Sequence, residues 1–323
     1  MDKKVILIVA GEPNSVFFEI LFKSLKKIKR RRAIILIGCK RNLINQAKFL
    51  NYKINLNIID KNDIKNLKKN INTINLIDVE YKNKKIFQKI SSDSNEYISN
   101  CFKVSFEILK KNKSFNLING PISKKYFLRN KYPGITEFLA KKFNKKNKIS
   151  MLIFHKDLSV CPITTHLPIA KISKNLSKKS IITQISLINK FFKSVIKKKA
   201  KIGVTGLNPH CENFLNFNEE RMIIEPSIKF LKKRKFFIKG PMSADTIFTK
   251  ENIKKFNVVV GMYHDQVLTP SKTLFGFEPI NITLGLPFIR VSPDHGPNES
   301  MMGKNISDPT SLIQSLNFLN KYC

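Results

Sequence analysis

Short apolar runs alternate with amphipathic segments along the first third of the chain, and this alternation limits the folds available to it. The runs Val5–Ala10, Ala33–Ile37 and Phe115–Ile118 have the length and composition of buried strands. Residues 96–110 instead carry apolar side chains at helical spacing. The alternation predicts an α/β fold in which helices cover the faces of a largely parallel sheet.

The middle of the chain has a different pattern. Apolar runs at 149–154 and 158–164 flank a charged turn, which predicts an antiparallel hairpin. The 323 residues are many for a single core, so two lobes are expected. The remaining predicted elements are amphipathic helices at 179–198 and 218–233 and strands at 201–205 and 256–260.

Composition excludes several classes of protein. An apolar fraction of 42% is sufficient for a folded core. No stretch approaches the roughly 18 apolar residues of a membrane span, and the amino-terminal apolar run is too short for a signal peptide. The five cysteines are scattered without a C-x-x-C pair, which favours reduced thiols. A cytoplasmic protein without a membrane partner is expected.

The formal net charge of +36 raises the question of nucleic-acid binding. The lysines are spread along the whole chain among asparagine and isoleucine, and no zinc-finger spacing or RNA-binding aromatic motif accompanies them. We therefore expect no specific nucleic-acid partner, and we interpret the charge as a compositional bias.

Histidines follow three of the predicted strands. His166 lies in "CPITTHLPIA", His210 in "VTGLNPHCEN" and His264 in "VVVGMYHDQV". Ligands gather at the carboxyl ends of strands in α/β sheets, and three neutral imidazoles there could hold a divalent metal. A lone histidine is more often a hydrogen-bonded or surface residue, and His155, inside a charged turn, keeps that interpretation.

Two aspartates accompany these histidines. Asp265 directly follows His264, and Asp245 lies in "GPMSADTIF". Either carboxylate could orient a histidine or accept a proton. For Asp245, a helix or turn cap formed with Thr246 is an equally good interpretation.

A candidate anion site occupies the glycine- and proline-rich run 271–296. Lys272, Asn281 and Arg290 can all donate to a phosphate or carboxylate, and arginine can do so with two parallel bonds. Thr136, in "GITEF", is expected at a helix amino terminus, where it could cap the helix or contact an anion.

A series of motifs extends over nearly the whole chain. They are "GEP" at Gly11, "NGPISK" at Asn119, "YPGITEFLA" at Tyr132, "TTHLP" at Thr164, "GLNPH" at Gly206, "GPMSADT" at Gly240, "YHDQ" at Tyr263 and "NITLGLPFIRVSPDHG" at Asn281. The last motif is long and specific. In this order the motifs resemble one family, the 4-hydroxythreonine-4-phosphate dehydrogenases of vitamin B6 synthesis.

The resemblance implies the two-lobed isocitrate/isopropylmalate dehydrogenase-like α/β fold, with an active-site cleft between the lobes. Residues 1–125 with 290–323 would form the outer lobe, and residues 126–289 a central lobe at the interface of a homodimer with a shared active site. The family oxidises 4-phosphooxy-L-threonine with NAD and a divalent metal. The product, 2-amino-3-oxo-4-phosphooxybutanoate, decarboxylates to 3-amino-2-oxopropyl phosphate on the route to pyridoxal 5'-phosphate.

The resemblance also implies roles for individual residues. His166, His210 and His264 would bind the metal, which could be zinc, magnesium, manganese or cobalt. Thr136, Lys272, Asn281 and Arg290 would contact the phosphorylated substrate. The candidate catalytic groups are Asp245, Asp265 and Lys272, and the choice of the proton-transfer group among them stays open. The stretch at His295 and Gly296 would lie near the adenine end of NAD, with NADP as the alternative cofactor. A G-x-G-x-x-G motif is not expected in this fold.

The chain departs from the family pattern at several positions. Ile135 stands where the family usually has a histidine, and the loop after "GEP" reads "NSVFFEI", which retains only Glu19. "CENFL" follows "GLNPH", and "PN" follows "DHG". These changes leave open a paralogue acting on 4-phospho-threonate or 4-phospho-erythronate. A basic nucleic-acid-binding protein without catalysis is the third and weakest alternative.

Overall fold

The computed structural model describes residues 5–29, 32–64, 67, 73–129, 131–145, 148–211 and 218–323. The chain divides into two compact units, Met1–Phe138 with Pro287–Cys323, and Leu139–Leu286. The family resemblance implied lobe boundaries at 125/126 and 289/290, whereas the compact units meet at 138/139 and 286/287. Both units are mixed α/β, as the pattern predicts, and all five cysteines are free.

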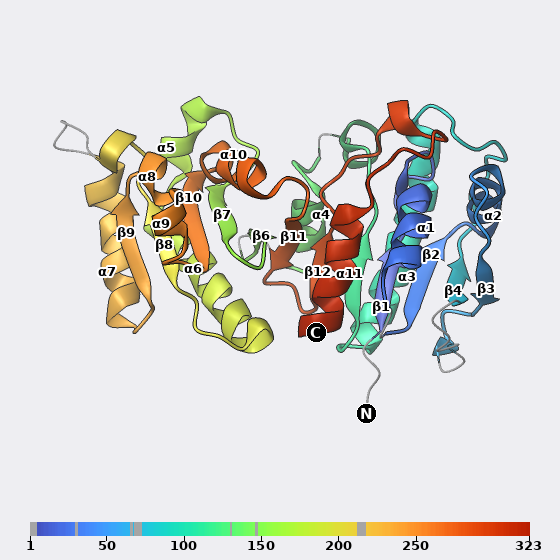
Figure 1. The fold of residues 1–323 in the computed structure, drawn as a ribbon, viewed down its shortest axis with the longest axis horizontal. Helices are drawn as coiled ribbons and strands as arrows, with labels where there is room; N and C mark the ends of the chain where they lie inside the picture. Colours follow the sequence, from blue (N-terminus) through green and yellow to red (C-terminus); the bar gives the residue numbers. More distant parts are fainter. Residues whose placement is uncertain are drawn as a thin grey trace. The chain divides into compact units, whose positions relative to one another are not determined.

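The strands of the first unit are parallel and run in the order β3-β4-β2-β1-β5-β12 (Figure 1). The predicted strands are present with ends shifted by about one residue. Their apolar side chains are almost fully buried, because helices cover the sheet. The strands are β1 (Ile6–Val9), β2 (Ile34–Gly38), β3 (Asn55–Ile58), β4 (Thr73–Asp78), β5 (Asn116–Asn119) and β12 (Arg290–Ser292).

The helices of the first unit include α3, which coincides with the predicted helix at 96–110. They are α1 (Phe17–Lys27), α2 (Lys40–Phe49), α3 (Asn95–Lys111) and α11 (Thr310–Tyr322). α4 (Ile135–Lys142) contains the boundary between the units.

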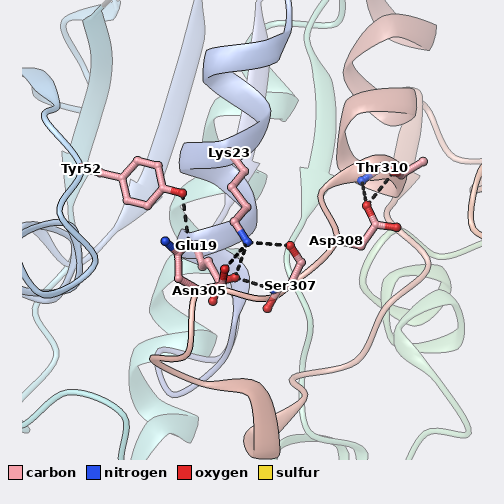
Figure 2. A network of polar contacts seen from close by, with 7 residues as sticks. All are labelled: Glu19, Lys23, Tyr52, Asn305, Ser307, Asp308 and Thr310. Atoms are coloured by element: carbon pink, nitrogen blue, oxygen red, sulfur yellow. Dashed lines mark hydrogen bonds and ion pairs between the residues drawn. The ribbon is translucent and has the colours of Figure 1, made fainter.

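The glutamate retained after the "GEP" motif ties α1 to the loop before α11 (Figure 2). Glu19 is 1% exposed, and its Oε1 accepts from the Ser307 N–H at 2.6 Å and from Lys23 Nζ at 2.8 Å. Lys23 also donates to the carbonyls of Asn305 and Ser307, each at 2.9 Å. Glu19 therefore has a structural explanation in this chain.

In the second unit the strand order is β11-β6-β7-β10-β8-β9. The predicted hairpin is confirmed, because β6 is antiparallel to β7. From β7 onward, the neighbours β7, β10, β8 and β9 are parallel. The strands are β6 (Ser150–Phe154), β7 (Ser159–Thr164), β8 (Ile202–Thr205), β9 (Ile238–Met242), β10 (Val258–Tyr263) and β11 (Ile280–Leu284).

The helices of this unit follow the prediction more loosely. The expected helix at 179–198 is α6 followed by a π-helical turn, and the one at 218–233 is a π-helical turn followed by α7. The helices are α5 (Ile172–Asn175), α6 (Lys178–Phe191), α7 (Glu225–Lys233), α8 (Ala244–Ile247), α9 (Lys250–Ile253) and α10 (His264–Phe275).

Helix α10 follows β10 without a loop, which places His264 at the end of the strand. The strand begins at Val258, two residues later than predicted, and continues to Tyr263. Val267 of α10 joins the buried core formed by β6, β7 and β10. Gly261 allows this close packing, since a Cβ there would meet Val267 Cγ1 at 2.4 Å. The core thus fixes the amino end of α10 at the carboxyl edge of the sheet.

Candidate active site

The three predicted metal histidines follow three neighbouring parallel strands of the second unit. His166 comes two residues after β7, His264 directly after β10, and His210 five residues after β8. β10 lies between β7 and β8, so the carboxyl ends of all three strands lie at the same edge. The sequence prediction that these histidines follow strand ends is thus confirmed for all three.

Two of these histidines line one cavity. The cavity has a volume of about 220 Å³, and His166 and His264 lie in its wall with their ring centroids 5.9 Å apart. Both rings could reach one ion, because each metal–nitrogen bond spans about 2 Å. The other lining residues are Thr164, Leu167, Ile169, Ile172, Tyr263 and Asp265.

Asp265 orients the His264 imidazole. The Nδ1 of His264 and the Oδ1 of Asp265 are 2.6 Å apart, which is the distance of a charge-assisted hydrogen bond. With Nδ1–H donating to the carboxylate, Nε2 carries the free lone pair. A metal-binding histidine is commonly held by a carboxylate in this way. The donor chemistry of this pair therefore fits a transition ion.

His210 pairs with the other predicted aspartate. Its Nδ1 is 3.8 Å from Asp245 Oδ2, and both side chains are largely exposed. Asp245 lies in the first turn of α8, so the capping interpretation with Thr246 gives way to a contact with His210. Across the described residues, no three side chains of histidine, cysteine, aspartate or glutamate are grouped closely enough to hold a metal. His166 and His264 are brought together, and His210 is not grouped with them.

Strained backbone accompanies two of these histidines. His166 has φ 47° and His210 has φ 53°, and Cys211 beside it has φ 59°. Side chains other than glycine enter this left-handed region at a cost, and such residues cluster at functional sites. Glu212–Leu215 of the "CENFL" departure lie outside the described residues.

The predicted anion contacts of the second unit lie on α10 and β11. Lys272 is two turns beyond His264 on the same helix, and its Nζ rests 4.8 Å from the centre of the Phe277 ring. Asn281 is half-buried on β11, and its Oδ1 is buried without a hydrogen-bond partner in the described structure. α10 therefore carries three predicted site residues, His264, Asp265 and Lys272.

Thr136 and Arg290 belong to the first unit, and both are buried. Thr136 lies inside the first turn of α4, which begins at Ile135, so it is not the cap residue that the sequence suggested. Arg290 is 0% exposed and donates from Nε to Asn119 Oδ1 at 2.8 Å. Burial lowers the pKa of Arg290 to about 9, which leaves the guanidinium charged at neutral pH. This bond joins Arg290, the first residue of β12, to Asn119, which is the last residue of β5 and the first of the "NGP" motif.

The predicted adenine-side residues differ in accessibility. His295 Nδ1 donates to the Gly296 carbonyl at 3.1 Å, and its Nε2 is buried without a partner in the described structure. Burial lowers the pKa of His295, so the ring is neutral at neutral pH. Gly296 is exposed, and a Cβ there would meet only Asn298 Oδ1 at 3.7 Å. The cofactor contact of this stretch stays a prediction.

Sequence reasoning missed the polar residues that join these strand ends. Thr164 Oγ1 donates to the Met262 carbonyl at 2.8 Å, which links the end of β7 to the end of β10. Gln266 likewise links the end of β10 to the end of β8 through Met262, Thr205 and Gly206. Thr164 and Gln266 stand inside the motifs "TTHLP" and "YHDQ", and that position was the available signal.

Solved structures define the class of protein. The crystal structure of 4-hydroxythreonine-4-phosphate dehydrogenase from Klebsiella pneumoniae covers 98% of each chain with a TM-score of 0.85 and 27% identity. Isocitrate dehydrogenase from Methylococcus capsulatus covers 98% of this chain and 85% of its own, with a TM-score of 0.51 and 9% identity, so that likeness concerns the fold alone. The protein therefore has the α/β dehydrogenase fold that these structures share.

Sequence comparisons narrow this class to a family. The family model of the pyridoxal phosphate biosynthetic protein PdxA matches residues 30–319, and the chain belongs to this family. A 4-hydroxythreonine-4-phosphate dehydrogenase from Sulfurihydrogenibium sp. strain YO3AOP1 is 38% identical over 96% of this chain and 95% of its own. A D-threonate 4-phosphate dehydrogenase from Salmonella typhimurium strain LT2 is 30% identical over 92% of each chain.

The family assignment identifies the chain as an enzyme, an oxidoreductase of the PdxA type. Among the described helices, none combines the length and apolarity that a membrane crossing requires.

Proposed function

We propose that this enzyme oxidises 4-phosphooxy-L-threonine with NAD and a divalent metal in the synthesis of pyridoxal 5'-phosphate. The product, 2-amino-3-oxo-4-phosphooxybutanoate, would lose carbon dioxide to give 3-amino-2-oxopropyl phosphate. Family membership over residues 30–319 supports the reaction class. A relative that is 38% identical and is named for this substrate supports the substrate.

The observation that carries the proposal is the His166–His264 pair. Two imidazoles with centroids 5.9 Å apart line one cavity, and a carboxylate 2.6 Å from Nδ1 orients the second ring. Imidazole ligands favour a transition ion such as zinc or cobalt over magnesium. We propose His210 as the third ligand, since it follows the strand adjacent to β10. When bound, the divalent ion lowers the pKa of the substrate hydroxyl and NAD accepts the hydride.

The chain's own residues would bind, orient and deprotonate the substrate. Lys272 and Arg290 supply positive charge for its phosphate and carboxylate, and Thr136 and Asn281 supply hydrogen bonds. Asp265 orients His264, which leaves the Asp245 carboxylate as the acceptor for the hydroxyl proton, while the Lys272 ammonium would stabilise the negative charge on the substrate oxygen. We propose Gly296, with His295 behind it, as a contact for the adenine end of NAD, or of NADP.

A second substrate is favoured by a specific observation. Relatives of this chain are named for either of two substrates, 4-hydroxythreonine 4-phosphate and D-threonate 4-phosphate. Ile135, the first residue of α4, cannot form the hydrogen bond of the usual family histidine. A paralogue acting on 4-phospho-threonate or 4-phospho-erythronate is therefore the alternative.

A substrate panel decides between them. Formation of NADH would be measured with 4-phosphooxy-L-threonine, 4-phospho-D-threonate and 4-phospho-D-erythronate on the metal-loaded enzyme. We expect the highest kcat/KM with 4-phosphooxy-L-threonine. We expect Ile135→His to raise that value roughly tenfold, the contribution of one good hydrogen bond. A clear preference for either acid that lacks the amino group would establish the alternative instead.

We also propose a cytoplasmic homodimer with a shared active site, as in the family resemblance. Sedimentation equilibrium would measure the mass, and mixing two inactive variants altered at different site residues would test sharing. Recovery of part of the activity in the mixed dimer is the expected result.

A further inference from the structure

The side chain of Gln266 joins the strand end that carries His264 to the loop that carries His210. Its Oε1 accepts from the Met262 N–H at 2.7 Å and from Thr205 Oγ1 at 2.8 Å. Its Nε2 donates to the Gly206 carbonyl at 2.8 Å. Met262 is on β10, whereas Thr205 and Gly206 are at the end of β8. One amide therefore bridges the carboxyl ends of two adjacent strands.

The carboxylate of Glu220 accepts further hydrogen bonds from the same loop. It is 1% exposed, and its Oε1 accepts from the N–H groups of Leu207 at 2.7 Å and Asn208 at 2.9 Å. Its Oε2 accepts from Asn208 Nδ2 at 2.8 Å. Glu220 lies near the start of the helix predicted at 218–233. The structure uses its carboxylate to bind two successive backbone N–H groups just before His210.

Gly206 makes room for this arrangement. A Cβ at that position would lie 3.0 Å from Glu220 Oε1 and 2.7 Å from Cys211 Sγ. The loop from Gly206 to Cys211 is therefore packed against the Glu220 carboxylate at one end, and Gln266 bonds to its first carbonyl. These contacts restrain a loop whose His210 and Cys211 adopt the left-handed conformation.

We propose that Gln266 and Glu220 are positioning residues, which hold the loop 206–211 so that the His210 imidazole is presented beside the strand end bearing His264. This inference rests on the proposed function, in which both histidines act at one site. Groups that orient metal ligands from behind typically influence metal affinity by about 10- to 100-fold. Neither residue is expected to touch the metal or the substrate.

Hydrogen exchange of the metal-free protein tests the anchoring separately from the chemistry. Glu220→Ala should speed exchange of the Leu207 and Asn208 amides by at least about tenfold, because both lose their acceptor. Glu220→Gln retains one carbonyl oxygen for these two donors and should restore most of the protection. Unchanged exchange in Glu220→Ala would overturn the proposed anchoring.

Titration with Co²⁺, followed by its visible absorption and by chelator competition, tests the effect on the site. Gln266→Glu keeps the two accepted bonds and replaces the donor to Gly206 by an oxygen, so it should weaken Co²⁺ binding about 10- to 100-fold. Glu220→Ala should do the same, and Glu220→Gln should bind nearly as wild type does. Gln46→Glu, the same change at a buried glutamine of the first unit that donates to the Pro13 carbonyl, is the control.

His210→Ala distinguishes a failure of the positioning inference from a failure of the proposed metal site. Weaker Co²⁺ binding in His210→Ala, with wild-type binding in Gln266→Glu and Glu220→Ala, would overturn the positioning inference and keep the proposed metal site. Wild-type protein that binds no Co²⁺, or His210→Ala that binds it normally, would contradict the proposed ligand set and overturn the inference with it.

Discussion

His264 and Asp265 show how one residue pair can define a site. The strand β10 ends at Tyr263, and the next two side chains, which both line the cavity, form a 2.6 Å hydrogen bond. That contact selects the tautomer of His264 in which Nε2 is free to bind a ligand. Asp265 is thereby assigned to orientation, whereas the sequence alone left its role open between orientation and proton transfer.

Asp265→Asn tests this orientation. The amide keeps the shape of the carboxylate and removes its charge, so His264 becomes a weaker ligand. We expect metal affinity and kcat/KM to fall about 10- to 100-fold with little change in melting temperature. Chelator competition and thermal unfolding would be measured on the same preparations. Undiminished metal affinity would contradict the role given to Asp265.

Glu12 of the "GEP" motif gives a prediction about pH. It is 2% exposed, and burial raises its pKa from the usual 4.5 to about 7, with the Glu299 charge adding to the effect. Ser94 Oγ donates to it at 2.8 Å and the Asn14 N–H at 3.2 Å, and these two bonds oppose the rise. The folded protein therefore binds a proton here that the unfolded chain releases at lower pH.

The sign of the effect follows from linkage. Stability due to Glu12 is fully present below pH 4.5 and is lost as the pH rises toward 7. The loss is on the order of 3 kcal/mol. Glu12→Gln cannot ionise, so its unfolding free energy should decline less over this range than that of the wild type. Denaturant unfolding at several pH values measures the difference, and parallel curves for the two proteins would refute the assignment.

At the scale of elements, the strand ends were the most predictable part of the site. Short apolar runs predicted β1, β2, β5, β6, β7, β8 and β10, because burial on both faces leaves a continuous apolar signal. β3, with asparagine at alternate positions, was missed, as were β4, β9, β11 and β12. The three histidines were found because polar residues directly after apolar runs are visible in the sequence.

The side-chain hydrogen bonds at the strand ends could not be predicted from the sequence. Gln266 and Glu220 are polar residues in segments read as a strand end and a helix start, and nothing local shows that they face inward. Their partners lie 60 residues away, at Gly206, and 13 residues away, at Leu207. The buried position of Arg290 was equally hard to predict, because its hydrogen-bond partner Asn119 lies 171 residues earlier in the chain. Such contacts arise from tertiary packing and leave no periodic pattern.

The Glu19 network gives an element-scale prediction (Figure 2). Glu19→Ala leaves the Ser307 N–H and the Lys23 ammonium without their carboxylate, and it should lower stability by about 2–3 kcal/mol. Exchange of amides around Ser307 should also speed up, because the loop before α11 is released from α1.

The control is Glu107→Ala, which breaks the Lys61–Glu107 pair. That pair has the same 2.8 Å separation, but both side chains are about 40% exposed. Solvent screening should make the loss much smaller than that of Glu19→Ala. Equal losses in the two variants, measured by denaturant unfolding, would show that the buried Glu19 network has no special role.

For the whole molecule, the charge of +36 has consequences beyond the site. It should attract any polyanion, so we expect binding to a generic DNA duplex at low salt and a steep loss of affinity as salt rises toward physiological levels. Fluorescence anisotropy over a salt series measures this slope. Tight binding that persists at physiological salt, or a preference for one sequence, would revive a nucleic-acid role.

In the proposed function, His166, His210 and His264, which follow β7, β8 and β10, bind a metal needed for oxidation of a phosphorylated hydroxy acid. The most direct test is NADH formation from 4-phosphooxy-L-threonine by wild-type and His264→Ala enzyme, each with and without added Co²⁺ or Zn²⁺. We predict metal-dependent turnover in the wild type and a loss of at least about 100-fold in the variant. Turnover that is independent of metal, or equal in the two proteins, would contradict a catalytic metal bound by these histidines.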